Sequence, residues 1–86
     1  MHTAPDHDEI LERLRRVVPE KVDVAPELLQ PDAQLVDIGI DSFSLIELVF
    51  VAEEEFRVKI PFEGLKVKTV GDVIEVIERR IRESAI

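Results

Sequence analysis

The sequence predicts an all-α protein. Three segments carry apolar residues at helical spacing, polar residues suited to capping precede them, and we find no convincing strand. Hydrophobic residues make up 45% of the 86 residues, which is enough for the core of one small domain. We therefore expect a single helical domain over residues 1–86, with residues 1–7 flexible because they are polar and terminal.

The first predicted helix begins near Asp8. Its apolar residues fall within one sector of a helix at about 100° per residue, and they are Ile10, Leu11, Leu14, Val17 and Val18. Pro19 removes a backbone donor and disfavours helical geometry at the residue before it. The helix is therefore expected to stop there, or to kink and continue to about Val22.

Residues 24–40 form a long predicted loop, because Pro26 and Pro31 interrupt any helical period. We expect one helical turn at residues 26–29. The side chains expected to hold the loop to the core are Leu28, Leu29, Leu35, Val36 and Ile38. Ordered loops of this length are uncommon in small domains and usually have a function.

The second predicted helix begins at Asp41 or Ser42 and runs to about Phe56. One apolar stripe suits the core and consists of Leu45, Leu48, Val49, Ala52 and Phe56. A second stripe lies on nearly the opposite face and consists of Phe43, Ile46 and Phe50. This second stripe either packs against the loop or forms a surface for partners.

The last predicted helix follows a connection, residues 57–68, that contains Pro61 and Gly64 and has room for one short helical turn. Thr69 and Asp72 have the spacing of a capping box, with Asp in place of the usual Glu. The apolar face of this helix consists of Val70, Val73, Ile74, Ile77 and Ile81.

The composition narrows the function classes. A net charge of −8 argues against binding to a nucleic-acid backbone and suits partners with basic surfaces. The absence of cysteine excludes disulfides and thiolate chemistry by the protein itself. The longest apolar run, residues 48–52, is too short to cross a bilayer, and the N-terminus lacks the pattern of a signal peptide. We therefore expect a cytoplasmic protein without membrane insertion.

The ten residues from Gly39 to Leu48 contain the one candidate for chemistry. A glycine turn leads into Asp41 and then Ser42, at the first turn of the second helix. A nucleophilic serine needs a positioned base, and both histidines, His2 and His7, lie in the predicted flexible end. No metal-chelating loop is present. We therefore expect no enzyme and no metal site; on local grounds alone, the Asp-Ser pair could simply cap the helix.

The residues from Asp37 to Pro61 resemble the core of acyl carrier proteins, and the resemblance extends over most of the chain. It implies a small four-helix bundle with a long loop between the first two helices and a short third helix. It also implies that Ser42 is esterified by 4′-phosphopantetheine from coenzyme A. Asp41 is then the acidic neighbour of the motif, and Gly39 supplies the turn. The arm would carry acyl or aminoacyl groups as thioesters in fatty acid, lipid or secondary-metabolite biosynthesis.

The same resemblance implies the partners of a monomeric carrier. These are a phosphopantetheinyl transferase, together with acyl-loading and acyl-transfer enzymes that have basic surfaces. The second helix would be the main recognition surface, with apolar anchors at Phe43, Ile46 and Phe50 and acidic contacts at Glu47, Glu53 and Glu54.

Three features depart from the family pattern. The first is Phe43, which stands where the family usually has leucine. The second is Phe62, which stands where an acidic or polar residue is usual, together with Gly64, which weakens the third helix. The third is Pro19, late in the first helix. The first two departures favour a specialised carrier over the housekeeping one. The alternative function is a non-covalent interaction module that retains the carrier fold.

Overall fold

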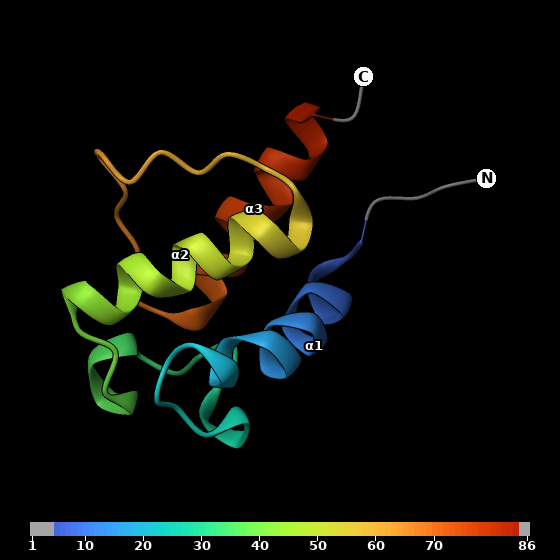
Figure 1. The fold of residues 1–86 in the computed structure, drawn as a ribbon. Helices are drawn as coiled ribbons and strands as arrows, with labels where there is room; N and C mark the ends of the chain where they lie inside the picture. Colours follow the sequence, from blue (N-terminus) through green and yellow to red (C-terminus); the bar gives the residue numbers. More distant parts are fainter. Residues whose placement is uncertain (1–4, 85–86) are drawn as a thin grey trace.

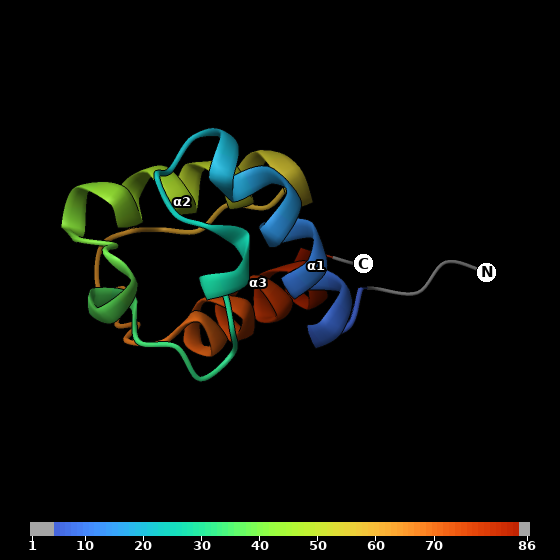
Figure 2. The same ribbon diagram turned by 90° about the horizontal axis from the view of Figure 1, so that it is seen from below.

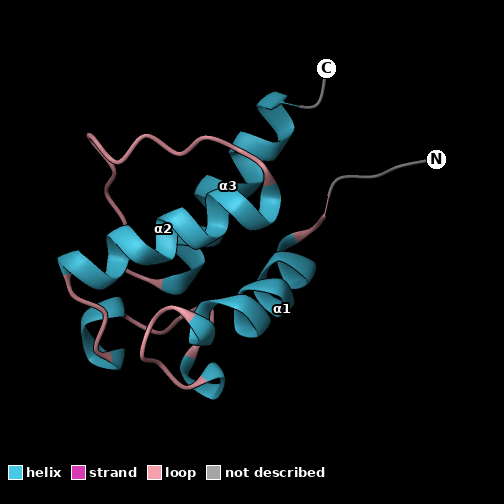
Figure 3. Ribbon diagram, in the orientation of Figure 1, coloured by secondary structure: helices cyan, strands magenta, loops and turns pink. Residues whose placement is uncertain are grey.

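The structure, a computed structural model, describes residues 5–84. Within this range the chain forms three α-helices, α1 (His7–Val17), α2 (Ser42–Phe56) and α3 (Val70–Ser84) (Figures 1 and 3). Short 3-10 turns lie at Val18–Glu20, Pro26–Leu28 and Leu35–Ile38. Extended pairing in residues 5–84 is limited to an isolated bridge between Gln34 and Thr69. The predicted all-α class is confirmed.

The expected short third helix does not form, so the described chain has three α-helices rather than four. Arg57 ends α2 in the left-handed conformation, at φ 57°. The following residues form an irregular α2–α3 connection (residues 57–69), whose turn contains Gly64 at φ 77°. Pro61 lacks a backbone donor and Gly64 favours non-helical geometry, so neither residue supports a helix here. Figure 3 shows the connection as an irregular path between α2 and α3.

Helix α1 begins earlier than the sequence indicated. The backbone N–H of Glu9 donates to Asp6 Oδ1 at 2.9 Å, so Asp6 is the N-cap and His7 is the first helical residue. The predicted flexibility of residues 1–7 is therefore wrong for Asp6 and His7, and residues 1–4 lie outside the described residues. The α-helix stops at Val17, and Pro19 lies in the 3-10 turn that follows.

The core lies where the three helices meet the long loop, and α1 packs against both α2 and α3 (Figures 1 and 2). The apolar faces predicted for the helices supply most of it. Its fully buried side chains include Ile10, Leu14, Val18, Leu29, Ile74 and Ile77. Because several of these come from segments far apart in the sequence, burial of this core fixes the position of the loop as well as of the helices.

Backbone hydrogen bonds attach the long loop to the start of α3. Leu35 N–H donates to the Lys68 carbonyl oxygen at 2.8 Å, and Gly71 N–H donates to the Pro31 carbonyl oxygen at 2.8 Å. A Cβ at position 71 would lie 2.8 Å from that same oxygen, so only glycine fits this approach without a shift of the backbone. The loop thus holds a fixed position before it enters α2.

Only part of the predicted loop anchoring is correct. Leu29 and Leu35 are buried, and Ile38 is partly buried against the core. Leu28 and Val36 are 46% and 76% exposed, so these two predictions are wrong. The 3-10 turns that contain Leu28 and Val36 place neighbouring side chains on different sides of the loop, and only one side faces the core.

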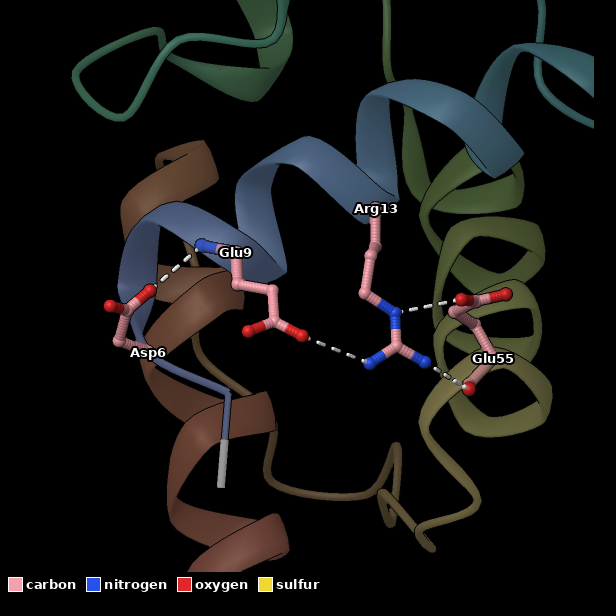
Figure 4. A network of polar contacts seen from close by, with 4 residues as sticks. All are labelled: Asp6, Glu9, Arg13 and Glu55. Carbon is pink, nitrogen blue, oxygen red and sulfur yellow. Dashed lines mark hydrogen bonds and ion pairs between the residues drawn. The ribbon is translucent and has the colours of Figure 1, made fainter. Parts of the chain in front are cut away.

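Arg13 joins α1 to the C-terminal end of α2 (Figure 4). Its Nε donates to Glu55 Oε2 at 2.8 Å and its Nη2 donates to the Glu55 carbonyl oxygen at 3.0 Å. The guanidinium carbon also lies 4.4 Å from the centre of the Phe56 ring. A weaker ion pair to Glu9, at 3.8 Å, orients the side chain from within α1. These contacts set the direction of α2, whose opposite end carries Ser42.

Candidate functional site at the start of α2

A left-handed glycine directs the chain into α2. Gly39 follows the 3-10 turn Leu35–Ile38 at φ 84°, and its N–H bonds back into that turn. Ile40 N–H donates to the Leu35 carbonyl oxygen at 2.9 Å, which closes the same turn. A side chain at position 39 would meet open space, so the requirement for glycine is conformational rather than steric crowding. The predicted glycine turn is confirmed.

Asp41 caps α2. Its Oδ1 accepts a hydrogen bond from the Ser44 N–H at 2.9 Å, and its backbone is extended, as an N-cap requires. This hydrogen bond from Ser44 holds the pKa of the Asp41 carboxyl below its ordinary value of 3.8. The carboxylate is therefore ionised at neutral pH and occupied by the cap, so it is not a free base for Ser42.

We expect Asp41→Ala to lower the midpoint of urea unfolding, whereas Asp41→Asn retains most of the cap because asparagine is also a good N-cap residue. The pKa of Asp41 is lower in the folded protein than its ordinary value of 3.8. The carboxylate therefore stabilises the fold fully above pH 3.8, and this stabilisation is lost as the pH falls through the pKa of the folded state. The advantage of the wild type over Asp41→Ala should therefore shrink below about pH 4. Urea unfolding at pH 7 and at pH 3 tests this; an advantage unchanged between them would contradict it.

Ser42 is the first residue of α2 and its side chain is exposed. The first backbone N–H groups of a helix lack intrahelical acceptors and form the positive end of the helix dipole. A negatively charged group attached to Ser42 Oγ would therefore lie next to these donors, an arrangement that proteins use widely for phosphates. The site suits a phosphodiester on the serine.

An open groove of about 640 Å³ begins beside Ser42. Its apolar walls come from the loop, from α2 and from the end of the α2–α3 connection, with Leu35, Val36, Ile40, Leu45 and Val67 among the lining residues. Asp41 and Lys68 are the charged residues along it. This groove was not predicted, because its walls come from three segments that only the tertiary structure brings together.

The residues around Ser42 do not form a catalytic set. His7 begins α1, at the end of the molecule away from the start of α2 (Figures 1 and 2), and His2 lies outside the described residues. Lys68 and the capped Asp41 are the titratable groups that line the groove. The geometry thus offers an accessible hydroxyl without a base positioned beside it.

The second apolar stripe of α2 is a surface. Phe43 is 69% exposed and Phe50 is 60% exposed, while Ile46 is 37% exposed. The stripe therefore does not pack against the loop as a core element. Glu54 is exposed and Glu47 is half-buried.

Glu53 has an additional structural contact. Its Oε2 accepts a hydrogen bond from the Ile60 N–H at 2.7 Å, which holds the α2–α3 connection against α2. A groove of about 420 Å³ nevertheless lies on this side of α2, lined by Lys21, Phe50, Val51 and the three glutamates Glu47, Glu53 and Glu54. The three acidic residues predicted for partners thus line one groove next to Phe50.

Comparison with known proteins shows the family of this small helical domain, which exposes a serine at a loop-to-helix junction. The sequence model of a family described as "Phosphopantetheine attachment site" matches residues 12–77. An acyl carrier protein of Phenylobacterium zucineum is 39% identical over 75 residues, which cover 85% of this chain and 95% of the relative. That of Thermosynechococcus vestitus is 38% identical over 78 residues, or 88% and 96% of the two chains.

The chain belongs to the acyl carrier protein family. Proteins of this family carry acyl groups on a phosphopantetheine arm and are not themselves catalysts, so the carrier function predicted from the sequence is confirmed at this level. Partners of such a carrier include a phosphopantetheinyl transferase and enzymes that handle acyl groups. Among the helices formed by residues 5–84, none has the length and apolar character needed to span a membrane.

Proposed function

We propose that Ser42 is the residue of this carrier that holds 4′-phosphopantetheine. The observation that carries the proposal is the exposed Ser42 side chain at the first position of α2, directly after the Asp41 cap and the Gly39 turn. The arm, when attached, supplies the thiol on which acyl groups travel. The chain contributes the acceptor hydroxyl, unpaired N–H groups beside the phosphate, and an apolar groove along which the arm and its cargo can lie.

The test is incubation of the purified protein with coenzyme A and a broad-specificity phosphopantetheinyl transferase, followed by intact mass measurement. We expect a gain of one phosphopantetheine, and tandem mass spectrometry of a digest should place it on Ser42. A modification on Ser44 or Thr69, or no modification, would rule the proposal out.

We also propose that α2 is the face on which the transferase and the acyl-handling enzymes dock, and that their surfaces there are basic. Phe43 and Phe50 are exposed apolar anchors, and Glu47 and Glu54 lie beside Phe50. Charge complementarity of this kind mainly raises the association rate and orients the partners.

The variant Glu47→Gln/Glu54→Gln is expected to raise the KM of the transferase for this carrier about fivefold, because each exposed ion pair contributes about 0.2–1 kcal/mol. Its kcat should change little, because Ser42 is untouched. Steady-state kinetics at two salt concentrations measure both, and the difference from wild type should decrease at high salt. Glu20→Gln/Glu27→Gln, which removes two exposed acids elsewhere, is the matched control and should behave like wild type; an equal effect there would contradict a specific face.

We further propose a specialised carrier, because Phe43 presents a large exposed ring where leucine is usual in the family. Full replacement of the housekeeping carrier in a fatty-acid synthase assay would overturn this. A single carrier domain over residues 1–86, a monomeric state and a cytoplasmic location remain predictions of the same proposal.

A further inference from the structure

The charges of this acidic protein are unevenly distributed along the chain. Residues 1–56 contain four basic and fourteen acidic side chains, whereas residues 57–86 contain seven basic and five acidic ones. The first part therefore carries a net charge of −10 and the second part a net charge of +2. The docking surface proposed above, the acidic face of α2, lies entirely within residues 1–56. Residues 57–86 contribute nothing to it.

Three of the seven basic side chains of the second part line one groove. It has a volume of about 320 Å³ and lies between the α2–α3 connection and the C-terminal half of α3. Lys66 comes from the connection, and Arg79 and Arg80 come from α3. Pro61, Leu65 and Val76 supply apolar walls.

The local charge of this groove is positive. Its one acidic lining residue is Glu63, against the three cations. Arg80 also has a contact of its own, because its Nη1 lies 3.4 Å from Glu83 Oε1. Lys66 and Arg79 are exposed. The groove thus offers two accessible cations beside an apolar wall, an arrangement that complements an acidic group next to an apolar one.

We propose that this groove, which we call the basic groove, is a second docking surface whose occupant is a short acidic segment of a partner protein. Carboxylates of the segment would meet Lys66 and Arg79, and an apolar side chain between them would contact Leu65 and Val76. The start of α2 lies at the opposite end of the molecule from the C-terminal half of α3 (Figures 1 and 2). A partner in the basic groove would therefore leave Ser42 accessible to another enzyme.

The charge distribution favours a short protein segment over other anions. An extended polyanion, such as a nucleic acid or an anionic membrane surface, would also be repelled by residues 1–56, whose net charge is −10. A short segment lies within about 10 Å of the groove and is screened from more distant acids. A second copy of the chain could place its acidic α2 face in the basic groove. This head-to-tail contact would extend into open chains of molecules, and it would cover the α2 docking face of each bound copy.

The experiment is a titration of the ¹⁵N-labelled protein with the peptide Glu-Glu-Asp-Leu-Asp-Glu-Glu, followed by amide chemical shifts. We expect shifts grouped at residues 62–66 and 76–80, which weaken as salt is added. The peptide Gln-Gln-Asn-Leu-Asn-Gln-Gln, with the same leucine but without the charges, should cause none.

The test variant is Lys66→Gln/Arg79→Gln, and its matched control is Arg16→Gln/Lys21→Gln, which makes the same change in net charge with exposed residues elsewhere. We expect affinity for the acidic peptide to fall on the order of fivefold in the test variant, because two surface charge contacts are lost, and to stay unchanged in the control. Ser42→Ala should bind the peptide like wild type, so failure of the attachment proposal would not affect this one.

Several results would overturn the proposal. They are equal weakening in both double variants, shifts grouped on α2 instead, or no shifts at all. If Arg79 were needed for binding to phosphatidylglycerol vesicles and the peptide did not bind, the occupant of the basic groove would be a lipid surface. Shifts that depend on protein concentration alone would identify a second copy.

Discussion

A Ser42→Ala variant is expected to accept no phosphopantetheine, whereas Ser44→Ala, the same chemical change two residues later, is expected to accept it at close to the wild-type rate. Ser42 is exposed at the start of α2. Ser44 is half-buried, lies about 200° further around the helix at about 100° per residue, and donates its N–H to Asp41. We therefore expect the transferase to modify the Ser42 hydroxyl and not that of Ser44.

Intact mass spectrometry after incubation with coenzyme A and transferase measures this difference, and circular dichroism checks that both variants are folded. A mass gain in Ser42→Ala would contradict the assignment. If Ser44→Ala lost modification as completely as Ser42→Ala, the substitutions would act by disturbing α2 rather than by removing the acceptor hydroxyl. The alternative function, a non-covalent interaction module, predicts a different result. In that case the protein would bind its partners without the cofactor, and the Ser42→Ala variant would bind them as well as the wild type does.

Ile77→Ala is expected to have the largest effect on stability. Ile77 is fully buried on the face of α3 that forms the core. Removing such a side chain costs about 2–5 kcal/mol through lost burial and the cavity left behind. A domain of this size has a total stability on the order of 4–13 kcal/mol, so the loss is a large share of it.

Thermal and urea unfolding followed by circular dichroism measure the cost. Ile81→Ala makes the same change one turn later on α3, where the side chain is only half-buried, and should cost clearly less. Equal losses in the two variants would contradict the burial that the structure assigns to Ile77. At temperatures where Ile77→Ala is partly unfolded, modification by the transferase should fall in proportion to the folded fraction.

The sequence predicted best what depends on neighbouring residues. Asp41 caps α2, and the Thr69–Asp72 box forms as expected: Asp72 N–H donates to Thr69 Oγ1 and Thr69 N–H donates to Asp72 Oδ2, both at 3.1 Å. These interactions span three residues, so their spacing can be read directly from the sequence. The same holds for the bounds of α2 and for the left-handed turn at Gly39.

The incorrect predictions concern segments whose own preferences are weak. The four-helix count came from the family resemblance, and it failed in the α2–α3 connection, where Pro61 and Gly64 oppose a helix. Leu28 and Val36 were assigned to the core because they are apolar, yet both are exposed. The path of the loop depends on hydrogen bonds to distant residues, from Leu35 to Lys68, from Val70 to Ala33 and from Arg15 to the Leu29 carbonyl oxygen, which no local pattern reveals.

By itself, the sequence determined the three α-helices, the caps of α2 and α3 and the motif around Ser42, because caps and apolar periods act over three or four residues. The family resemblance carried by that motif also gave the carrier function. Only the tertiary structure decided that Phe43 and Phe50 are exposed, that a groove opens beside Ser42, and that Lys66 approaches Arg79 and Arg80. Each of these depends on which faces of distant segments are buried together, and packing of the whole chain settles that.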